Sequence, residues 1–260
     1  MTTILDTIIE HKKMEVLKRK GRKPVEALKE KPLYQRTPVD PILSLDGKGP
    51  KVIAEFKRRS PSKGSLSDVI NPVPVVRSYM KGGAVASSIL TDRDFFGGSF
   101  RDLENVKLAL PDFPLLRKDF IVDPYQVHEA KAYGADLILL IAAVLDKQKV
   151  RELTKLAGDL GLNVLLEVHT VEETDRWIPG ISLVGVNNRD LKDFSVDIER
   201  SVNLIPALPS ETIKISESGL NDPEEVRQLY QAGFSGFLMG EKFMKSGDPG
   251  AALQKFISDL

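Results

Sequence analysis

From Lys51 to the C-terminus, short apolar runs typical of buried strands alternate with amphipathic runs typical of helices. The predicted strands lie near residues 52–57, 85–90, 114–118, 136–142, 163–168, 183–187, 212–217 and 235–239. The predicted helices lie near 72–81, 100–109, 124–133, 147–160, 172–177, 195–207, 223–232 and 249–259. Strands that alternate with helices pair in parallel beneath those helices, so the chain is predicted to be an α/β protein.

Eight strand–helix units fit a (β/α)8 barrel, whose usual size of about 250 residues matches a chain of 260. An open doubly wound sheet is the competing fold, and it would favour a glycine-rich dinucleotide loop after its first strand. The chain has the basic segment KRRSPSKG at that place instead. We therefore expect one (β/α)8 TIM barrel domain over residues 1–260, with residues 1–50 as an N-terminal helical extension.

Residues that start and stop helices agree with these ranges. Asp123-Pro124 and Asp222-Pro223 each place a capping Asp before a Pro at the first helical position. Gly134, Gly161 and Gly233 each follow a predicted helix, where a left-handed backbone favours glycine.

The extension is predicted to contain one helix over Thr3–Lys20 and a second, short helix over Pro41–Leu45. The residues available for one face of the first helix are Ile4, Ile8, His11, Val16 and Leu17. Prolines break the chain between the two helices. The extension can close the bottom of the barrel or cover the substrate, and the sequence favours neither arrangement.

Composition narrows the classes of partner and chemistry. Lys and Arg together number 37, as do Asp and Glu, which argues against a nucleic acid or an anionic membrane as the main partner. The chain has no cysteine, which excludes thiolate metal sites and thiol nucleophiles and favours a cytoplasmic protein. The longest apolar run, Leu137–Leu145, is too short to span a bilayer. His11, His128 and His169 lack metal-ligand spacing, so we expect no metal site and place them at the surface or in structural roles.

Charged or amide residues stand at the carboxyl ends of five predicted strands, an expensive place for them unless they have partners. The segments are VIAEFK, PLLRK, NVLLE, LVGVNN and IKISES. Parallel strands bring these ends together, so the pattern predicts one shared active site at this end of the barrel. A sixth buried segment, Asp136–Val144, ends in apolar residues.

Two of these strand ends carry lysines. Glu55 and Lys57 are two residues apart and therefore share a face, which suits a salt bridge closing the mouth as well as a functional pair. Arg117 and Lys118 face opposite ways, so only one of them can enter the mouth. Lys118 shares the parity of Leu116 and lies nearest the strand end. Taken singly, such a lysine is more often solvated.

Two further strand ends carry a carboxylate and a pair of amides. Glu167 is a candidate general base whose pKa burial would tune. It could also cap the next helix, but Thr170 already supplies that cap. Asn187 and Asn188 suit the orientation of a polar substrate, or an Asx turn at the strand end.

Glycines follow the seventh and eighth predicted strands, in Glu217-Ser218-Gly219 and Met239-Gly240-Glu241. In barrels, the loops after these strands often hold phosphate at the N-terminus of a short helix. Gly219 and Gly240 would let backbone N–H groups approach an anion. The two loops together therefore predict a phosphate site.

Six segments resemble the indole-3-glycerol phosphate synthase family in order and spacing: IAEFKRRSPSKG, SILTDRDFFGGS, LLRKDFIVDPYQV, LLEVH, VGVNNRDL and ISESGL. The resemblance runs from about Leu5 to the C-terminus. It implies a (β/α)8 barrel that converts 1-(2-carboxyphenylamino)-1-deoxyribulose 5-phosphate to indole-3-glycerol phosphate, CO2 and water in tryptophan biosynthesis. It also implies a small phosphorylated substrate and neither a metal nor an organic cofactor.

The resemblance implies roles for the residues at the strand ends. Lys118 would be the general acid on the carbonyl that joins the ring, and Glu167 would be the general base that helps to expel water. Lys57 would bind the substrate carboxylate and could share the acid role, while the step at which each lysine acts stays open. Glu55 would orient Lys57 and contact substrate hydroxyls. The polar network would be completed by Asn187 and Glu217.

For binding, the resemblance implies that Phe96 and Phe120 flank the anthranilate ring, with the apolar end of the fourth strand as a wall. The residues that would hold the phosphate are Ser60, Ser218, Gly219 and Gly240. Arg189 belongs to the same implied substrate-binding set. Glu241 follows the phosphate glycine, and we expect its side chain to face outward because an anion beside a phosphate is unfavourable.

Two other hypotheses are weaker. A related barrel, phosphoribosylanthranilate isomerase, would pair a Cys with an Asp, and this chain has no Cys. A non-catalytic barrel that binds phosphate-bearing ligands would gain nothing from buried charges such as Lys118 and Glu167. We expect a monomer. Whether the loop over Arg58–Asp68 closes on the substrate stays open.

Overall fold

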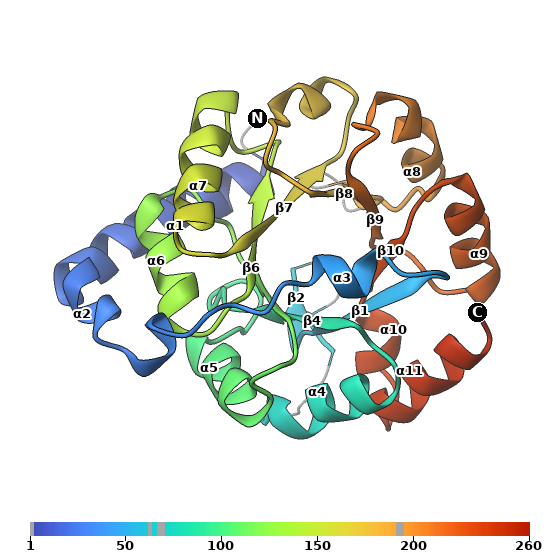
Figure 1. Ribbon diagram of the computed structural model, residues 1–260, viewed down its shortest axis with the longest axis horizontal. Coiled ribbons are helices and arrows are strands. Elements are labelled where there is room, and N and C mark those ends of the chain that lie inside the picture. Colours follow the sequence, from blue (N-terminus) through green and yellow to red (C-terminus); the bar gives the residue numbers. More distant parts are fainter. Residues whose placement is uncertain (1–2, 62–63, 67–70, 191–194) are drawn as a thin grey trace.

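Eight parallel strands close into a barrel in a computed structural model that describes residues 3–61, 64–66, 71–190 and 195–260 (Figure 1). Around the barrel the order is β1-β10-β9-β8-β7-β6-β5-β4, so neighbours in sequence are neighbours in space. The strands are β1 (Lys51–Phe56), β4 (Ala86–Leu90), β5 (Leu115–Lys118), β6 (Leu137–Ile141), β7 (Asn163–Val168), β8 (Leu183–Asn187), β9 (Ile213–Glu217) and β10 (Gly236–Met239). The predicted (β/α)8 barrel is confirmed, and each predicted strand agrees to within about a residue.

Helices surround the barrel and bury the outer faces of its strands (Figure 1). They are α4 (Pro72–Lys81), α5 (Phe100–Ala109), α6 (Pro124–Ala132), α7 (Lys147–Asp159), α8 (Glu199–Leu204), α9 (Pro223–Ala232) and α11 (Pro249–Ser258). Asp123 and Asp222 form capping boxes at α6 and α9 as predicted. The three glycines expected to end helices all have positive φ: Gly134, Gly161 and Gly233.

Two predicted helices differ from the structure, one in its type and the other in its length. The segment predicted over 172–177 is a 3-10 helix, η2 (Glu172–Arg176), which ends as the chain approaches Pro179 and the left-handed Gly180. The helix predicted over 195–207 begins only at Glu199 and continues as η3 (Ile205–Ala207). Val196 instead forms a β-bridge with Arg189, so the residues before α8 are extended.

Short elements around the loops were not predicted. The hairpin β2 (Arg59–Ser60) and β3 (Gly64–Ser65) follows β1, and α10 (Glu241–Met244) follows β10. The possible lid over Arg58–Asp68 includes residues 62, 63, 67 and 68, which lie outside the described residues. In the described ranges, no helix combines the length and the apolar character needed to cross a membrane.

The extension serves both ends of the barrel. Its short helix α3 (Ile42–Leu45) lies across one end, where the buried Leu45 packs with Ile53, Ile215 and other interior residues (Figure 1). This is the end at which the strands start, so α3 closes the barrel bottom. The links α2 (Val25–Lys29) and η1 (Pro32–Tyr34) pack beside α6.

The first helix, α1 (Ile4–Arg22), buries only part of the face predicted for it. Its buried residues are Ile8, Lys12 and Val16, at a spacing of four, whereas Leu17 is 63% exposed and the His11 side chain 43%. Ile8 and Val16 belong to the predicted face, but a charged residue, Lys12, occupies the middle of the buried stripe in place of His11. Lys12 contacts acidic residues just beyond β4 and β5, so α1 reaches the end of the barrel where the strands finish.

Candidate active site

The carboxyl ends of the strands open into a cavity of about 480 Å³. All thirteen residues expected at the site line it: Glu55, Lys57, Ser60, Phe96, Lys118, Phe120, Glu167, Asn187, Arg189, Glu217, Ser218, Gly219 and Gly240. The strand ends and the family resemblance together therefore named residues from seven of the eight strands or from the loops that follow them.

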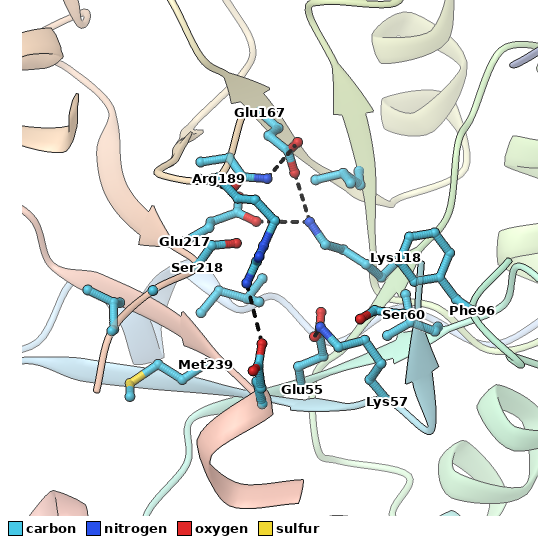
Figure 2. A pocket seen from close by; sticks show the side chains of 18 of the residues that line it. Glu55, Lys57, Ser60, Phe96, Lys118, Glu167, Arg189, Glu217, Ser218 and Met239 are labelled. Atoms are coloured by element: carbon cyan, nitrogen blue, oxygen red, sulfur yellow. Dashed lines mark hydrogen bonds and ion pairs between the residues drawn. The ribbon is translucent and has the colours of Figure 1, made fainter. Parts of the chain in front are cut away.

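Lys118 lies at the centre of the polar part of this cavity, between two carboxylates (Figure 2). Its Nζ is 2.8 Å from Oε2 of Glu167 and 2.9 Å from Oε2 of Glu217. With Glu55, these residues come from β1, β5, β7 and β9, which are alternate strands of the barrel. Alternate strands contribute the layers of side chains that fill such barrels, so the four charges form the top layer above an apolar interior.

The shared lysine gives the two carboxylates different pKa values. Burial acts to raise the pKa of Glu167, but Lys118 outweighs it and lowers that pKa to about 2, with a further hydrogen bond from Asn187 Nδ2 at 3.1 Å. Burial raises the pKa of Glu217 to about 7, and the negative charge of Glu167 adds to this rise against the opposing effect of Lys118. Burial acts to lower the pKa of Lys118, but the carboxylates outweigh it and raise that pKa. At neutral pH the site therefore holds a charged Lys118, a charged Glu167 and a partly protonated Glu217.

Gly185 makes room for Glu217 and was missed in the sequence. A Cβ at position 185 would clash with Oε1 of Glu217. That oxygen is buried and has no hydrogen-bond partner among the described residues. A glycine inside a strand often marks such a close approach, and this was the available signal in LVGVN.

The raised pKa of Glu217 predicts a pH dependence of stability. Between its ordinary value of 4.5 and about 7, the folded protein binds more protons at Glu217 than the unfolded chain does. This contribution is therefore complete below pH 4.5 and is lost as pH rises through 7. We expect Glu217→Gln to gain several degrees in Tm relative to the wild type between about pH 5 and about pH 8, since about 1 kcal/mol shifts Tm by roughly 2–4 °C.

Thermal unfolding of both proteins across this range tests the expectation. Glu211→Gln is the matched control, because Glu211 is an exposed acid just before the same strand. Its Tm profile should run parallel to that of the wild type. If the profile of Glu217→Gln is parallel as well, Glu217 does not titrate in this window.

Glu55 and Lys57 share a face as predicted and form an ion pair of 2.5 Å beside the lysine-centred cluster (Figure 2). Glu55 packs against Gly240, where a Cβ would lie 2.6 Å from the Cβ of Glu55. The salt bridge and a functional role are compatible, since the Lys57 side chain remains 17% exposed at the mouth.

Residues adjacent to the site residues point out of the barrel. Arg117 is fully buried on the outer side of β5, where it contacts Asp119 and Glu129. Asn188 donates to Ser216 Oγ at 3.0 Å and to the Ser218 carbonyl at 3.1 Å. Asn188 therefore holds the loop after β9 in place, whereas its neighbour Asn187 lines the cavity.

Aromatic side chains form one side of the cavity. The rings of Phe96 and Phe120 have centroids 6.0 Å apart and are tilted by 41°. Leu139 and Ile141 of β6 line the cavity as well, so the apolar end of this strand is the expected wall. Figure 2 places Ser60 beside Phe96 and away from Ser218. Ser60 lines the same cavity as the loops after β9 and β10, and its part in holding the phosphate stays a prediction.

The opposite side of the cavity carries the loops expected to hold phosphate. Ser218 has φ 67° and Gly219 φ 80°, which turns the chain sharply at the end of β9. A non-glycine residue in this region is uncommon and often marks a functional loop. At Gly219 a Cβ would clash with Val196. Gly240 precedes α10, whose N-terminus has no side-chain cap among the described residues.

The predicted outward orientation of Glu241 was wrong in part. Glu241 lines the cavity and forms ion pairs with Arg189 at 3.3 Å and Lys245 at 2.6 Å. Burial acts to raise the pKa of Glu241, but Lys245 and Arg189 outweigh it and lower that pKa. The two cations offset the negative charge that a phosphate here would otherwise meet. Figure 2 shows Arg189 extending across the mouth.

His169 is a second residue whose place the sequence did not reveal. It is buried beside the site, with Nε2 3.4 Å from Oε1 of Glu167 and Nδ1 3.3 Å from Oε2 of Glu173. Burial acts to lower the pKa of His169, but the two carboxylates outweigh it and raise that pKa. No group of three or more His, Asp or Glu able to hold a metal occurs in the described part of the chain.

Comparisons with known proteins agree with this geometry. A family model described as indole-3-glycerol phosphate synthase matches residues 5–256. The indole-3-glycerol phosphate synthase of Bacteroides thetaiotaomicron is 46% identical over 262 residues and covers 100% of both chains. That of Mycolicibacterium vanbaalenii is 41% identical and covers 98% of this chain and 94% of its own.

A solved structure of 3-hexulose-6-phosphate synthase superposes with a TM-score of 0.61 at 13% identity, covering 81% of this chain and 98% of that one. A likeness at this identity concerns the barrel fold alone. The sequence matches show the family as well as the fold, because they run along nearly the whole chain. The chain therefore belongs to the indole-3-glycerol phosphate synthase family.

Proposed function

We propose that this protein closes the indole ring of indole-3-glycerol phosphate in tryptophan biosynthesis. The substrate would be 1-(2-carboxyphenylamino)-1-deoxyribulose 5-phosphate, and the other products would be CO2 and water. The observation that carries the proposal is the position of Lys118 between Glu167 and Glu217, with an aromatic pair on one side of the cavity and glycine-bearing loops on the other. A substrate with a ring at one end and a phosphate at the other fits this layout.

The proposed reaction begins with attack of the ring carbon that bears the carboxylate on the ketone carbon of the sugar chain. Lys118 would protonate the ketone oxygen as the new carbon–carbon bond forms, which requires the raised pKa that keeps it charged. The attack places positive charge on the nitrogen and the ring. The ionised Glu167, 2.8 Å from Lys118, would stabilise that charge.

Aromaticity would then return in two steps. The carbon–carbon bond to the carboxylate breaks and releases CO2, and the electron pair returns to the ring. The hydroxyl at the former ketone carbon next leaves as water, with a proton supplied by a lysine, while Glu167 accepts a proton from the neighbouring carbon. The pair of Glu55 and Lys57 would bind the substrate carboxylate and hydroxyls at the mouth.

Both ends of the substrate would be held so that the ring carbon stays against the ketone. Phe96 and Phe120 would flank the ring, and Ser60 lies on their side of the cavity. The backbone at Ser218, Gly219 and Gly240 would hold the phosphate, with Arg189 nearby. Fixing both ends lowers the entropic part of the barrier to ring closure.

We propose that the protein is a monomer whose site is complete within one chain. All thirteen proposed residues come from the same barrel. We also propose that residues 1–260 fold as one domain with residues 1–50 as its extension, and that the protein is cytoplasmic and uses no cofactor. Light scattering of the purified protein would report its mass in solution, and a dimer would contradict the proposed monomer.

A turnover assay tests the proposed function. The purified protein is incubated with the substrate in the presence of a metal chelator, and indole fluorescence is followed. We expect product to accumulate at a rate unaffected by the chelator. Binding of the substrate without turnover would contradict the proposal, and loss of turnover in chelator would contradict the absence of a metal.

A further inference from the structure

Lys12 is a fully buried lysine in the contact between α1 and the barrel. Its Nζ lies 2.8 Å from Oδ2 of Asp92, 2.9 Å from Oδ1 of Asp119 and 2.8 Å from Oε2 of Glu15. Burial acts to lower the pKa of Lys12, but the three acids outweigh it and raise that pKa, so Lys12 is a cation. A buried charge needs such partners, and two of them are themselves almost fully buried.

Asp92 organises the loop that carries Phe96. This residue follows β4, and its Oδ1 accepts hydrogen bonds from the backbone N–H of Phe95 at 2.8 Å and of Phe96 at 3.1 Å. Its backbone carbonyl accepts from Gly98 N at 2.6 Å. The carboxylate of Asp92 therefore folds the loop back on itself and sets the position from which Phe96 enters the cavity.

Asp119 does the same for the loop after β5. It stands between Lys118 and Phe120, and its Oδ1 accepts from Phe120 N at 2.9 Å. Its other oxygen accepts from Thr91 Oγ1 at 2.6 Å and pairs with Arg117 at 2.9 Å. Asp119 thus fixes the backbone at Phe120.

One cation therefore joins the two carboxylates that hold the two loops. Asp119 would keep Arg117 as a partner without Lys12, but no other cation lies within ion-pair distance of Asp92 in the described part of the chain. Loss of Lys12 would leave Asp92 buried and uncompensated, next to a second carboxylate. The loop after β4 would then move to reach water, and Phe96 would move with it.

We propose that Lys12 is a positioning residue that sets the spacing of Phe96 and Phe120 and thereby the binding of the substrate's aromatic ring. Lys12 touches neither ring nor substrate and acts through Asp92 and Asp119. The proposal rests on the proposed function for the identity of the ligand. According to this proposal, α1 affects the binding of the substrate's ring and does not affect the binding of its phosphate.

The experiment compares two lysines that are equally buried. Lys107 is 0% exposed at the side chain, like Lys12, but it pairs with Asp136 at 2.6 Å, directly before β6 and at the opposite end of the barrel. Lys12→Met and Lys107→Met each break a buried ion pair. Affinities are measured calorimetrically for indole-3-glycerol phosphate and for glycerol 3-phosphate, which lacks the ring.

For Lys12→Met we expect the Kd of indole-3-glycerol phosphate to rise roughly 10-fold, on the scale of two aromatic contacts, and kcat to fall with it. The Kd of glycerol 3-phosphate should change by less than about twofold. For Lys107→Met both values should stay within about twofold of the wild type. Equal losses for the two ligands, or equal behaviour of the two variants, would overturn the proposal.

A second variant covers the case in which Lys12→Met does not fold. In the double variant Lys12→Met with Asp92→Asn, no uncompensated charge remains, and the amide oxygen at position 92 can still accept from Phe95 and Phe96. The double variant lacks the link from position 92 through Lys12 to Asp119, so we still expect weaker binding of indole-3-glycerol phosphate but not of glycerol 3-phosphate. Unchanged binding of indole-3-glycerol phosphate would count against the role of Lys12. A wild type that binds both ligands but shows no turnover would remove the proposed function and leave this comparison intact.

Discussion

Replacing Lys118 with Met is expected to lower kcat by roughly 100-fold or more, the scale of a lost general acid. Met matches the length of the lysine stem but supplies neither a proton nor a positive charge. Glu167 and Glu217 would then face each other without the cation that lies 2.8 and 2.9 Å from them. Their mutual repulsion would keep one of them protonated, so the ionised carboxylate proposed to stabilise the ring cation would also be lost in part.

Steady-state kinetics with the purified variant measure this effect. Lys214→Met is the matched control: Lys214 also lies on a barrel strand, β9, but it alternates with the inward Ile213 and Ile215 and therefore faces outward. Its kcat should equal that of the wild type within about twofold. A Lys118→Met protein that turns over at the wild-type rate would exclude Lys118 as the acid.

The side chains that meet at the strand ends could be predicted from the sequence because two simple rules determine their positions. Side chains alternate along a strand, and parallel strands finish at one end of a barrel. These rules placed Glu55, Lys118 and Glu167 in one cavity and separated Lys118 from Arg117. These two rules do not predict the segments that follow the strands. There, short elements such as η2 and α10 depend on a few local hydrogen bonds.

Lys12 and Gly185 could not be found in this way because their significance lies in contacts between distant segments, whereas the rule of alternation could have indicated His169. Lys12 interrupts an otherwise apolar stripe, and its acid partners follow β4 and β5. Gly185 matters only because Glu217 occupies the space beside it. His169 follows the inward Glu167 by two residues, and that parity was the available signal for its approach to the site.

Replacing Glu167 is expected to have the second large effect on kcat, because the environment of this carboxylate keeps it ionised. Lys118 outweighs burial and holds its pKa near 2, and Asn187 donates to its Oε1. Glu167→Gln keeps the size and one acceptor oxygen but removes the charge. We expect kcat to fall roughly 100-fold or more, while the Kd of indole-3-glycerol phosphate changes by less than about threefold, because the ring and phosphate contacts remain.

The pH profile distinguishes a lost base from a disturbed site. A carboxylate with a pKa near 2 is ionised throughout the working range, so the ratio of wild-type to variant kcat should stay constant from about pH 6 to about pH 9. Glu172→Gln, at an exposed acid that begins η2 after the same strand, should match the wild type. A ratio that approaches one toward low pH would mean that Glu167 titrates in this range, which would contradict a pKa near 2.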